Sequence, residues 1–333
     1  MATPVTYPSA KQFVNIAKET TQGTPVETGQ KTYPFSEFKP KDDPVLLDDE
    51  GLRGSMVKNY GVIQGPQKSS FTGSGAVFLD LLPHFLFNLM GAVTTSGPVS
   101  SIYTHIASLL NSGTGQPPSH TLTDFQGLTA TSGARSYAGA SLSELTLKGN
   151  PESTLLEMAI KGSAFWSNAF PTAPPTVDLP TESPMGAWRV SLSFAAAANL
   201  TIREWEVTTT REISVQHTSQ NSQAPYIIQR GPIECEGKFF VAKPSDETFL
   251  TYFRGNTQPV FALTISNGLA AAAARTLTIN INAMAFTAVE INRGDAAVGY
   301  DCTFKAVANT TDAGASGGFA PVKYTVTNAI ASY

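Results

Sequence analysis

The residue that most resembles a catalytic group is a serine between glycines. The segment GASGG at 314–318 has the spacing of a hydrolase nucleophile elbow, in which Ser316 would attack an acyl carbon. That elbow needs a strand before the serine, a helix after it, and then an acid and a histidine further along the chain. All four histidines precede Ser316, and the residues that follow it alternate like a strand around Tyr324. We therefore expect no hydrolase activity at this serine.

Other candidate clusters have weaker spacing. The carboxylates at 48–50 are adjacent, whereas a calcium loop alternates its ligands around a turn glycine, so a solvated loop is the better interpretation. His105 and His120 lack the i, i+4 spacing of a metal-binding helix. The two cysteines, Cys235 and Cys302, are too few for a disulfide framework and are expected to be buried thiols. The sequence predicts no enzyme, no bound metal and no cofactor.

Composition indicates a folded and mildly acidic chain. Of its 333 residues, 41% are hydrophobic and 14% are charged, and the formal net charge is −4. This balance argues against a surface that binds nucleic acid by neutralising phosphates. No apolar run reaches the roughly 18–20 residues of a membrane span, and the opening MATPVTYPSAKQ lacks the regions of a signal peptide. We expect synthesis in a cytoplasm and no membrane partner.

Hydrophobic alternation predicts β-strands along most of the chain. In the second half, mostly apolar residues recur at every other position in runs at 188–194, 205–215, 233–241, 261–265, 277–281, 302–306 and 322–326, with Thr209, Arg211 and Gly237 as exceptions. A period of two indicates strands with one buried and one solvated face. The first half shows the same pattern at 145–147 and 156–160, between stretches rich in Gly, Ser, Thr and Pro. We predict a mainly β fold of antiparallel sandwiches or partial barrels.

One short phrase occurs twice in the sequence. VIQGPQKSSFTG spans 62–73 and IIQRGPIECEG spans 227–237, and each precedes an apolar run and a short helix. The first helix is expected in DLLPHFLFNLMG, with Pro83 in its first turn and Gly91 past its end. The second is expected in PSDETFLTYFRG, with Gly255 as its stop. The recurrence of strand, helix and glycine at nearly equal spacing indicates a duplicated domain, not a solenoid repeat.

A proline-rich stretch separates the two copies. FPTAPPTVDLPTESP has prolines at 171, 174, 175, 180 and 184, so it can neither continue a helix nor lie inside a sheet. We place a first β domain at 1–170, a linker at 171–184 and a second β domain at 185–333. Each domain is expected to be a β-sandwich or partial barrel with one short flanking helix. A proline-rich loop within one larger domain is the alternative.

Two long segments match no regular element. They lie at 38–59 and 94–119, and loops of such length in a compact domain usually serve a function or an interface. We therefore expect the protein to have partners.

Four stretches carry a resemblance to a known family. They occur in consistent order along nearly the whole chain and read KQFVNIAKETTQGTPV, SIYTHIASLLNSGTGQPPSHTLTDFQG, SYAGASLSELTLKGN and PYIIQRGPIECEGKFFVAKPSDETFLTYF. In them the sequence resembles the major tail tube proteins of long-tailed, non-contractile bacteriophages. The resemblance implies a structural protein of the virion, made in the host cytoplasm, built on a β-sandwich with a flanking helix.

The resemblance also implies how such a chain assembles. Inner strands of neighbouring copies join into a continuous barrel around a lumen that carries DNA, and the rings stack into a tube. Chains with one domain form rings of six, whereas a duplicated chain would form a pseudo-six-fold ring from three copies. The implied partners are further copies of the chain, the tape measure, tail tip and tail terminator proteins, and DNA that passes without sequence-specific binding.

Stacking of rings needs surfaces other than the ring contacts. The segment at 38–59 carries both signs of charge and could form complementary contacts between rings, with a mobile solvated loop as the alternative. The candidate residues for these contacts are Lys41, Asp42, Asp43, Asp48, Asp49, Glu50, Arg53 and Lys58.

Two other readings of the chain remain open at this point. One half could decorate the outside of a ring of six chains, in which case only the other half would line the lumen. A β-sandwich binding module of a phage fibre or adhesin would also have this composition and these loops, and would place sugar-stacking aromatic residues at a common loop end.

Overall fold

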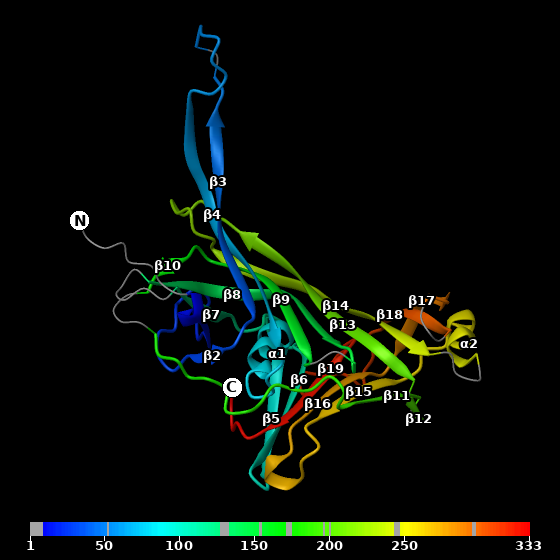
Figure 1. Cartoon of the computed structure of the whole chain (residues 1–333). Coiled ribbons are helices and arrows are strands. Elements are labelled where there is room, and N and C mark those ends of the chain that lie inside the picture. Colours follow the sequence, from blue (N-terminus) through cyan, green and yellow to red (C-terminus); the bar gives the residue numbers. More distant parts are fainter. Residues whose placement is uncertain are drawn as a thin grey trace.

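Most of the chain forms two antiparallel β-sheets (Figure 1). The two sheets share one continuous cluster of buried apolar side chains. The computed structural model describes residues 9–51, 53–126, 133–152, 155–170, 175–195, 197–199, 201–242, 247–294 and 298–333. The mainly β fold predicted from alternation is confirmed, and the described helices are few and short. None of these helices is long and apolar enough to span a membrane.

The larger sheet contains strands from both halves of the chain. They are β1 (Phe13–Lys18), β2 (Lys31–Tyr33), β3 (Glu37–Asp49), β4 (Gly61–Ala76), β7 (His120–Phe125), β8 (Ala134–Gly149), β9 (Glu157–Ala164), β10 (Asn168–Ala169), β13 (Ile202–Gln216), β14 (Ile227–Ala242), β17 (Met284–Asn292) and β18 (Gly299–Ala306).

The smaller sheet also combines the two halves. Its strands are β5 (Gly91–Val99), β6 (Ile102–Leu109), β11 (Val190–Phe194), β12 (Ala197–Asn199), β15 (Phe261–Ser266), β16 (Thr276–Ile281) and β19 (Lys323–Asn328). The helical segments are η1 (Ser9–Lys11), α1 (Leu82–Met90), α2 (Thr248–Gly255) and η2 (Ala271–Ala273).

Within the larger sheet, one unbroken run of strands has the order β3–β4–β9–β8–β13–β14–β18–β17. Strands β7, β1 and β2 extend from the first part of β8, which is long enough to pair with β7 before it pairs with β9 and β13. The run therefore consists of four strands of the first half followed by four of the second.

The two sets of four strands have the same connectivity and the same irregularities. In each set a long hairpin, β3–β4 or β13–β14, lies beside the second strand of a later hairpin, β8–β9 or β17–β18. The ladder of the first long hairpin shifts between Pro44 and Leu46, and that of the second between Arg211 and Ile213. These irregularities lie opposite Gly65-Pro66 and Gly231-Pro232 respectively.

This position explains why the phrase containing Gly-Pro occurs twice. Proline lacks the N–H that a ladder needs, and glycine adapts to a distorted backbone, so the pair belongs at a β-bulge. Leu82, where α1 begins, follows Gly65 by the same number of residues as Thr248, where α2 begins, follows Gly231. The match in register, bulge and helix position supports a common origin of the two sets.

The helix ends agree with prediction at one site and differ at the other. Helix α1 has Pro83 in its first turn and ends at Met90, just before Gly91, whose φ is 96°. Helix α2 includes Gly255, and the left-handed residue is Asn256, with φ of 48°. The prediction of Gly255 as the stop was wrong by one residue, because asparagine also tolerates the left-handed conformation.

The two long unassigned segments are mostly strands, which corrects the expectation of structureless loops. The first forms most of β3, and the second forms β5 from Thr94 to Val99 and then β6. In β3 most side chains beyond Asp43 are exposed on both faces, so the alternation that reveals a half-buried strand is missing. Pairing with β4 holds this strand, and that pairing is not encoded in its own sequence pattern.

The described part of the proline-rich stretch packs along the first half. The Thr32 backbone N–H donates to the Asp178 carbonyl at 2.8 Å, and Lys31 forms an ion pair with Asp178 at 2.6 Å. Residues 171–174 lie outside the described part of the chain, and the domain limits at 170 and 185 stay a prediction.

Candidate functional site

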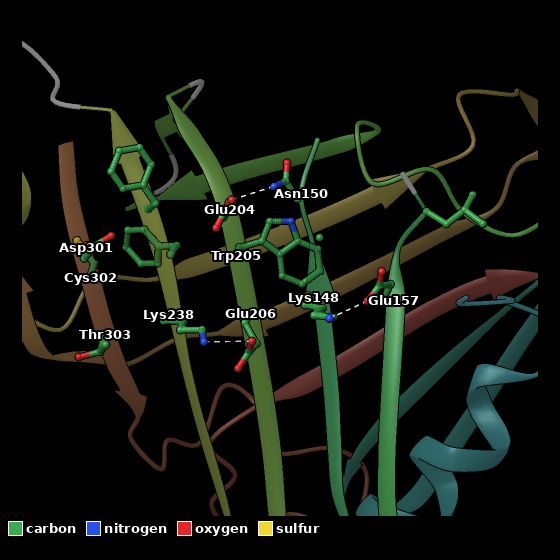
Figure 2. Close-up of a pocket in the computed structure, with 14 residues that line it drawn as sticks. Lys148, Asn150, Glu157, Glu204, Trp205, Glu206, Lys238, Asp301, Cys302 and Thr303 are labelled. Atoms are coloured by element: carbon green, nitrogen blue, oxygen red, sulfur yellow. Dashed lines mark hydrogen bonds and ion pairs between the residues drawn. The ribbon is translucent and has the colours of Figure 1, made fainter. Parts of the chain in front are cut away.

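The most extensive polar feature is the solvated face of the eight-strand run. On each strand one set of side chains enters the core while the alternate set points to solvent; in β13, for example, Trp205 and Val207 are buried between Glu204, Glu206 and Thr208. A hollow of about 360 Å³ lies on this face over β8, β13, β14 and β18. Figure 2 shows the residues that line it. Its lining comes from both halves of the chain.

Cross-strand ion pairs connect the side chains of this face. Lys148 contacts Glu157 at 2.7 Å and Lys238 contacts Glu206 at 3.3 Å, as the dashed lines of Figure 2 indicate. The contact with Glu157 raises the pKa of Lys148. Such exposed pairs contribute roughly 0–1 kcal/mol each, so they order the face without adding much stability.

Charge is distributed unevenly over the solvated face. In the first half the two signs are nearly balanced among Glu37, Asp43, Glu144, Glu157, Lys39, Lys41, Lys68, Lys148 and Lys161. In the second half acids predominate, with Glu204, Glu206, Glu212, Glu234, Glu236, Glu290 and Asp301 against Lys238 and Lys305. The face as a whole is acidic.

The junction between the two sets joins β8 to β13 antiparallel. Glu206 lies opposite Lys148, Val207 opposite Leu147, and Thr208 opposite Thr146. The hydroxyls of Thr146 and Thr208 are 3.0 Å apart on the solvated face. Strand β8 is the last strand of the first set and β13 is the first strand of the second set. The edge of the last strand of one set can therefore pair with the edge of the first strand of another.

Two strand edges of the run have no partner among the described residues. Strand β3 pairs only with β4, and β17 pairs only with β18. Unpaired edges are ready templates for strands of another chain, and native proteins cover, charge or pair them. Strand β3 bears Pro40, Pro44 and several charges, and β17 has exposed Glu290 and Ile291 near its end.

The outer part of the β3–β4 hairpin, residues 45–66, projects from the rest of the molecule and is called the arm here (Figure 1). Many of its apolar side chains are exposed, and these are Val45, Leu46, Leu47, Met56, Val57, Val62 and Ile63. A contiguous apolar surface of this kind on a projecting hairpin is typical of a docking element.

The eight charged candidate residues from the sequence lie on β3 and in the turn of the arm, and most find partners within the hairpin. Lys41 contacts Asp43 at 2.5 Å, Lys58 contacts Glu50 at 3.3 Å, and Arg53 forms an ion pair with Asp49.

Two further candidates hydrogen-bond to neutral side chains. Asn59 donates to Asp48 at 2.8 Å. Asp42 points to the other face of β3, where it accepts hydrogen bonds from Ser69 and Ser167. Hydrogen bonding to Lys41, and then to Ser70, lowers the pKa of Asp43. The role of the eight charged candidates in contacts between molecules stays a prediction.

The residues considered above as catalytic or metal-binding candidates make structural contacts instead. The Ser316 hydroxyl donates to the Leu109 carbonyl at 2.7 Å and accepts from the Asn111 N–H at 3.3 Å, which ties its loop to the end of β6. Within the described ranges no group of three His, Cys, Asp or Glu side chains could hold a metal ion. Burial raises the pKa of Cys235 and Cys302 to about 12, consistent with buried thiols.

Two histidines flank the ring of Tyr333, and a third packs against one of them. The rings of His84 and His105 lie 5.0 and 4.8 Å from it, and His120 lies 5.8 Å from His84. Burial, with the nearby charge of Lys18, lowers the pKa of His84 to about 4. Burial also lowers the pKa values of His105 and His120. Each of these shifts favours the neutral imidazole in the folded protein.

We expect this cluster to make folding sensitive to acid. Because His84 takes up a proton near pH 6.5 in the unfolded state and only near pH 4 in the folded state, stability falls as the pH drops between these values. His84→Gln should flatten the dependence of the urea midpoint on pH from 7 to 4, whereas His217→Gln, an exposed control, should leave it unchanged. An equally steep dependence in both variants would contradict this account.

Comparison with family models assigns the chain to a protein family. The family described as phage tail tube protein matches residues 9–306, which is most of the sequence. The chain belongs to the phage tail tube protein family. A comparison with curated proteins finds no match. Membership in a tail tube family implies a structural protein of the virion tail that assembles with itself into a tube.

Sequence reasoning selected the segment 38–59 for contacts between rings, but it did not identify the open strand edges or the exposed apolar residues of the arm. The unpaired edges of β3 and β17 are properties of the sheet, and alternation in a single strand does not report its neighbours. A partial signal was present in Pro40 and Pro44, because proline within a strand favours an edge position. The exposed apolar residues of the arm were not recognised as a surface because charged residues lie between them in the sequence.

Proposed function

We propose that three copies of this chain form a ring, that rings stack into the tube of a non-contractile phage tail, and that the solvated face of the eight-strand run lines the DNA channel. One observation carries the proposal: the run is open at both ends, and its internal β8–β13 junction joins the end of one set to the start of another. Repeating that junction between chains, β17 to β3, closes a barrel.

Three copies follow from the paired sets. Each chain supplies two similar domains, at 1–170 and 185–333 with the linker at 171–184, so three chains provide six. Six chains would double the number of strands in the barrel and widen it in proportion, since barrel diameter grows roughly linearly with strand number. Head-to-tail contacts of this kind form rings only when the rotation closes.

The acidic face suits a channel for DNA. Glu234 and Glu236 on β14, together with the other acids of the second half, would repel phosphates. The lysines are mostly engaged with neighbouring carboxylates, as Lys148 and Lys238 are. A basic wall would release counterions and hold the DNA, whereas this face leaves it free to slide.

Stacking is assigned to the arm. Its apolar side chains would pack on the adjacent ring, and the charged candidates from Lys41 to Lys58 would set the register of that contact. The chain acts as a structural element without catalysis or a cofactor. Its partners are other copies, the tape measure, tail tip and terminator proteins, and passing DNA; it is made in the host cytoplasm.

Electron microscopy of the purified chain tests the proposal. As concentration is raised, negatively stained samples should show hollow tubes with a regular axial repeat. Protein that stays monomeric at all concentrations and binds glycans would overturn the proposal in favour of a fibre or adhesin module.

A further inference from the structure

We infer the register of the contact between chains: β17 of one chain pairs antiparallel with β3 of the next, with Glu290 directly opposite Lys41 of the neighbouring chain. The inference rests on the proposed ring and adds to it the residues that meet. The β8–β13 junction is the template, because β17 corresponds to β8 and β3 corresponds to β13.

The correspondence of β3 with β13 is fixed by the bulges of the long hairpins. Val45 in β3 faces two residues of β4, Gly65 and Pro66, and Glu212 in β13 faces the equivalent pair of β14, so each bulge has its extra residue in the second strand of the hairpin. Counting back from the bulge along each strand places Lys41 at the position of Thr208. Both residues point to the solvated face, which agrees with the assignment.

The correspondence of β17 with β8 is fixed by a second pair of bulges. The ladder of β8 with β9 shifts between Leu142 and Glu144, and that of β17 with β18 shifts between Phe286 and Ala288. Counting forward from these bulges places Glu290 at the position of Thr146.

In the template Thr146 is directly opposite Thr208, with their hydroxyls 3.0 Å apart. Transfer of this register places Glu290 opposite Lys41 and Ile291 opposite Pro40. The pairing matches what each edge exposes. The Lys41 side chain is 76% exposed, and Ile291 is 54% exposed.

Charge on the β17 edge supports the same register. Glu290 lies directly opposite Asp301 on β18, and like charges facing each other across a ladder are unfavourable. A lysine from the neighbouring chain at this point relieves the repulsion. A slip of two residues one way would place Asp43 against Glu290 and add a third acid, and a slip of one residue would turn the apolar positions to solvent.

Disulfide trapping in assembled tubes tests the register. Directly opposite residues have Cβ atoms about 4.5–5.5 Å apart, and diagonal neighbours are about 7–8 Å apart, beyond the reach of a disulfide. Lys41→Cys with Glu290→Cys should link neighbouring chains on mild oxidation and give a covalent trimer on a non-reducing gel. Lys39→Cys with Glu290→Cys, the diagonal control, should not. The natural thiols are buried and stay reduced.

Thr146→Cys with Thr208→Cys serves as the positive control, since it should close an intrachain disulfide under the same conditions. If wild-type tubes form and the Lys41–Glu290 pair does not link while this control does, the register is wrong although the proposed function stands. Linking of the diagonal pair alone would have the same meaning. Absence of wild-type tubes would instead overturn the proposed function.

A charge exchange gives a second readout that needs no oxidation. Lys41→Glu alone and Glu290→Lys alone should each raise the concentration needed for tube formation, by about three- to tenfold. The double variant should return toward the wild-type value. Equal effects of the double and the single variants would contradict direct pairing of these two residues.

Discussion

A chain without its arm should fold and form rings but no tubes. Replacing residues 44–67 by Asn-Gly leaves Asp43 opposite Lys68, a pair of the β3–β4 ladder that a two-residue hairpin turn can close. The removed segment makes little contact with the core, so the free energy of unfolding from urea denaturation should change by less than about 0.5 kcal/mol. Tube formation, followed by electron microscopy, should be lost at every concentration at which the wild type polymerises.

Two sets of substitutions separate the parts played by apolar and charged residues of the arm. Leu46→Ser with Ile63→Ser should impair stacking strongly, because these side chains are exposed in the single chain and would be buried between rings. Arg53→Ala with Lys58→Ala should impair it less, because their partners lie within the arm. Normal tubes from the chain that lacks the arm would refute its role in stacking.

Loss of the buried Glu19 carboxylate should have the largest effect on stability. It accepts hydrogen bonds from the Ser119 and Thr121 hydroxyls at 2.6 and 2.7 Å and from the Gly139 N–H at 2.7 Å. Glu19 thus connects the end of β1 to β7 and β8. Glu19→Ala leaves buried donors unsatisfied, and we expect a cost of about 3 kcal/mol or more.

Urea denaturation of the unassembled chain, followed by tryptophan fluorescence, measures this cost. The midpoint should fall with an unchanged slope, which indicates lower stability without a change in the surface exposed on unfolding. Glu27→Ala is the matched control, since Glu27 is exposed and close in sequence. Equal midpoints for the two variants would show that the hydrogen bonds of Glu19 are replaced by others.

The strands of the second half could be predicted because their burial alternates cleanly. In β13 and β14 each buried residue, such as Val207 or Phe239, lies between solvated ones, and this pattern is local in sequence. The two occurrences of Gly-Pro could also be recognised, since both mark a bulge at the same place in a long hairpin. The strands and the bulges could be predicted because residues close together in the sequence determine them.

The features that matter for assembly depend on distant parts of the chain. The order of the strands brings β8 next to β13 and leaves the edges of β3 and β17 open, although these strands lie far apart in sequence. The arm is held by pairing between β3 and β4, while its own residues, such as Leu46 and Lys58, show neither helical nor strand-like burial. Edges and projections arise from the whole sheet.

A cryo-electron microscopy reconstruction of the assembled tube tests the central claim most directly. The account predicts three chains in each ring, with β3, β4, β9, β8, β13, β14, β18 and β17 of every chain lining the lumen and β17 paired to β3 of the next chain. Six chains in each ring, with only one half of each chain lining the lumen and the other half outside, would contradict it.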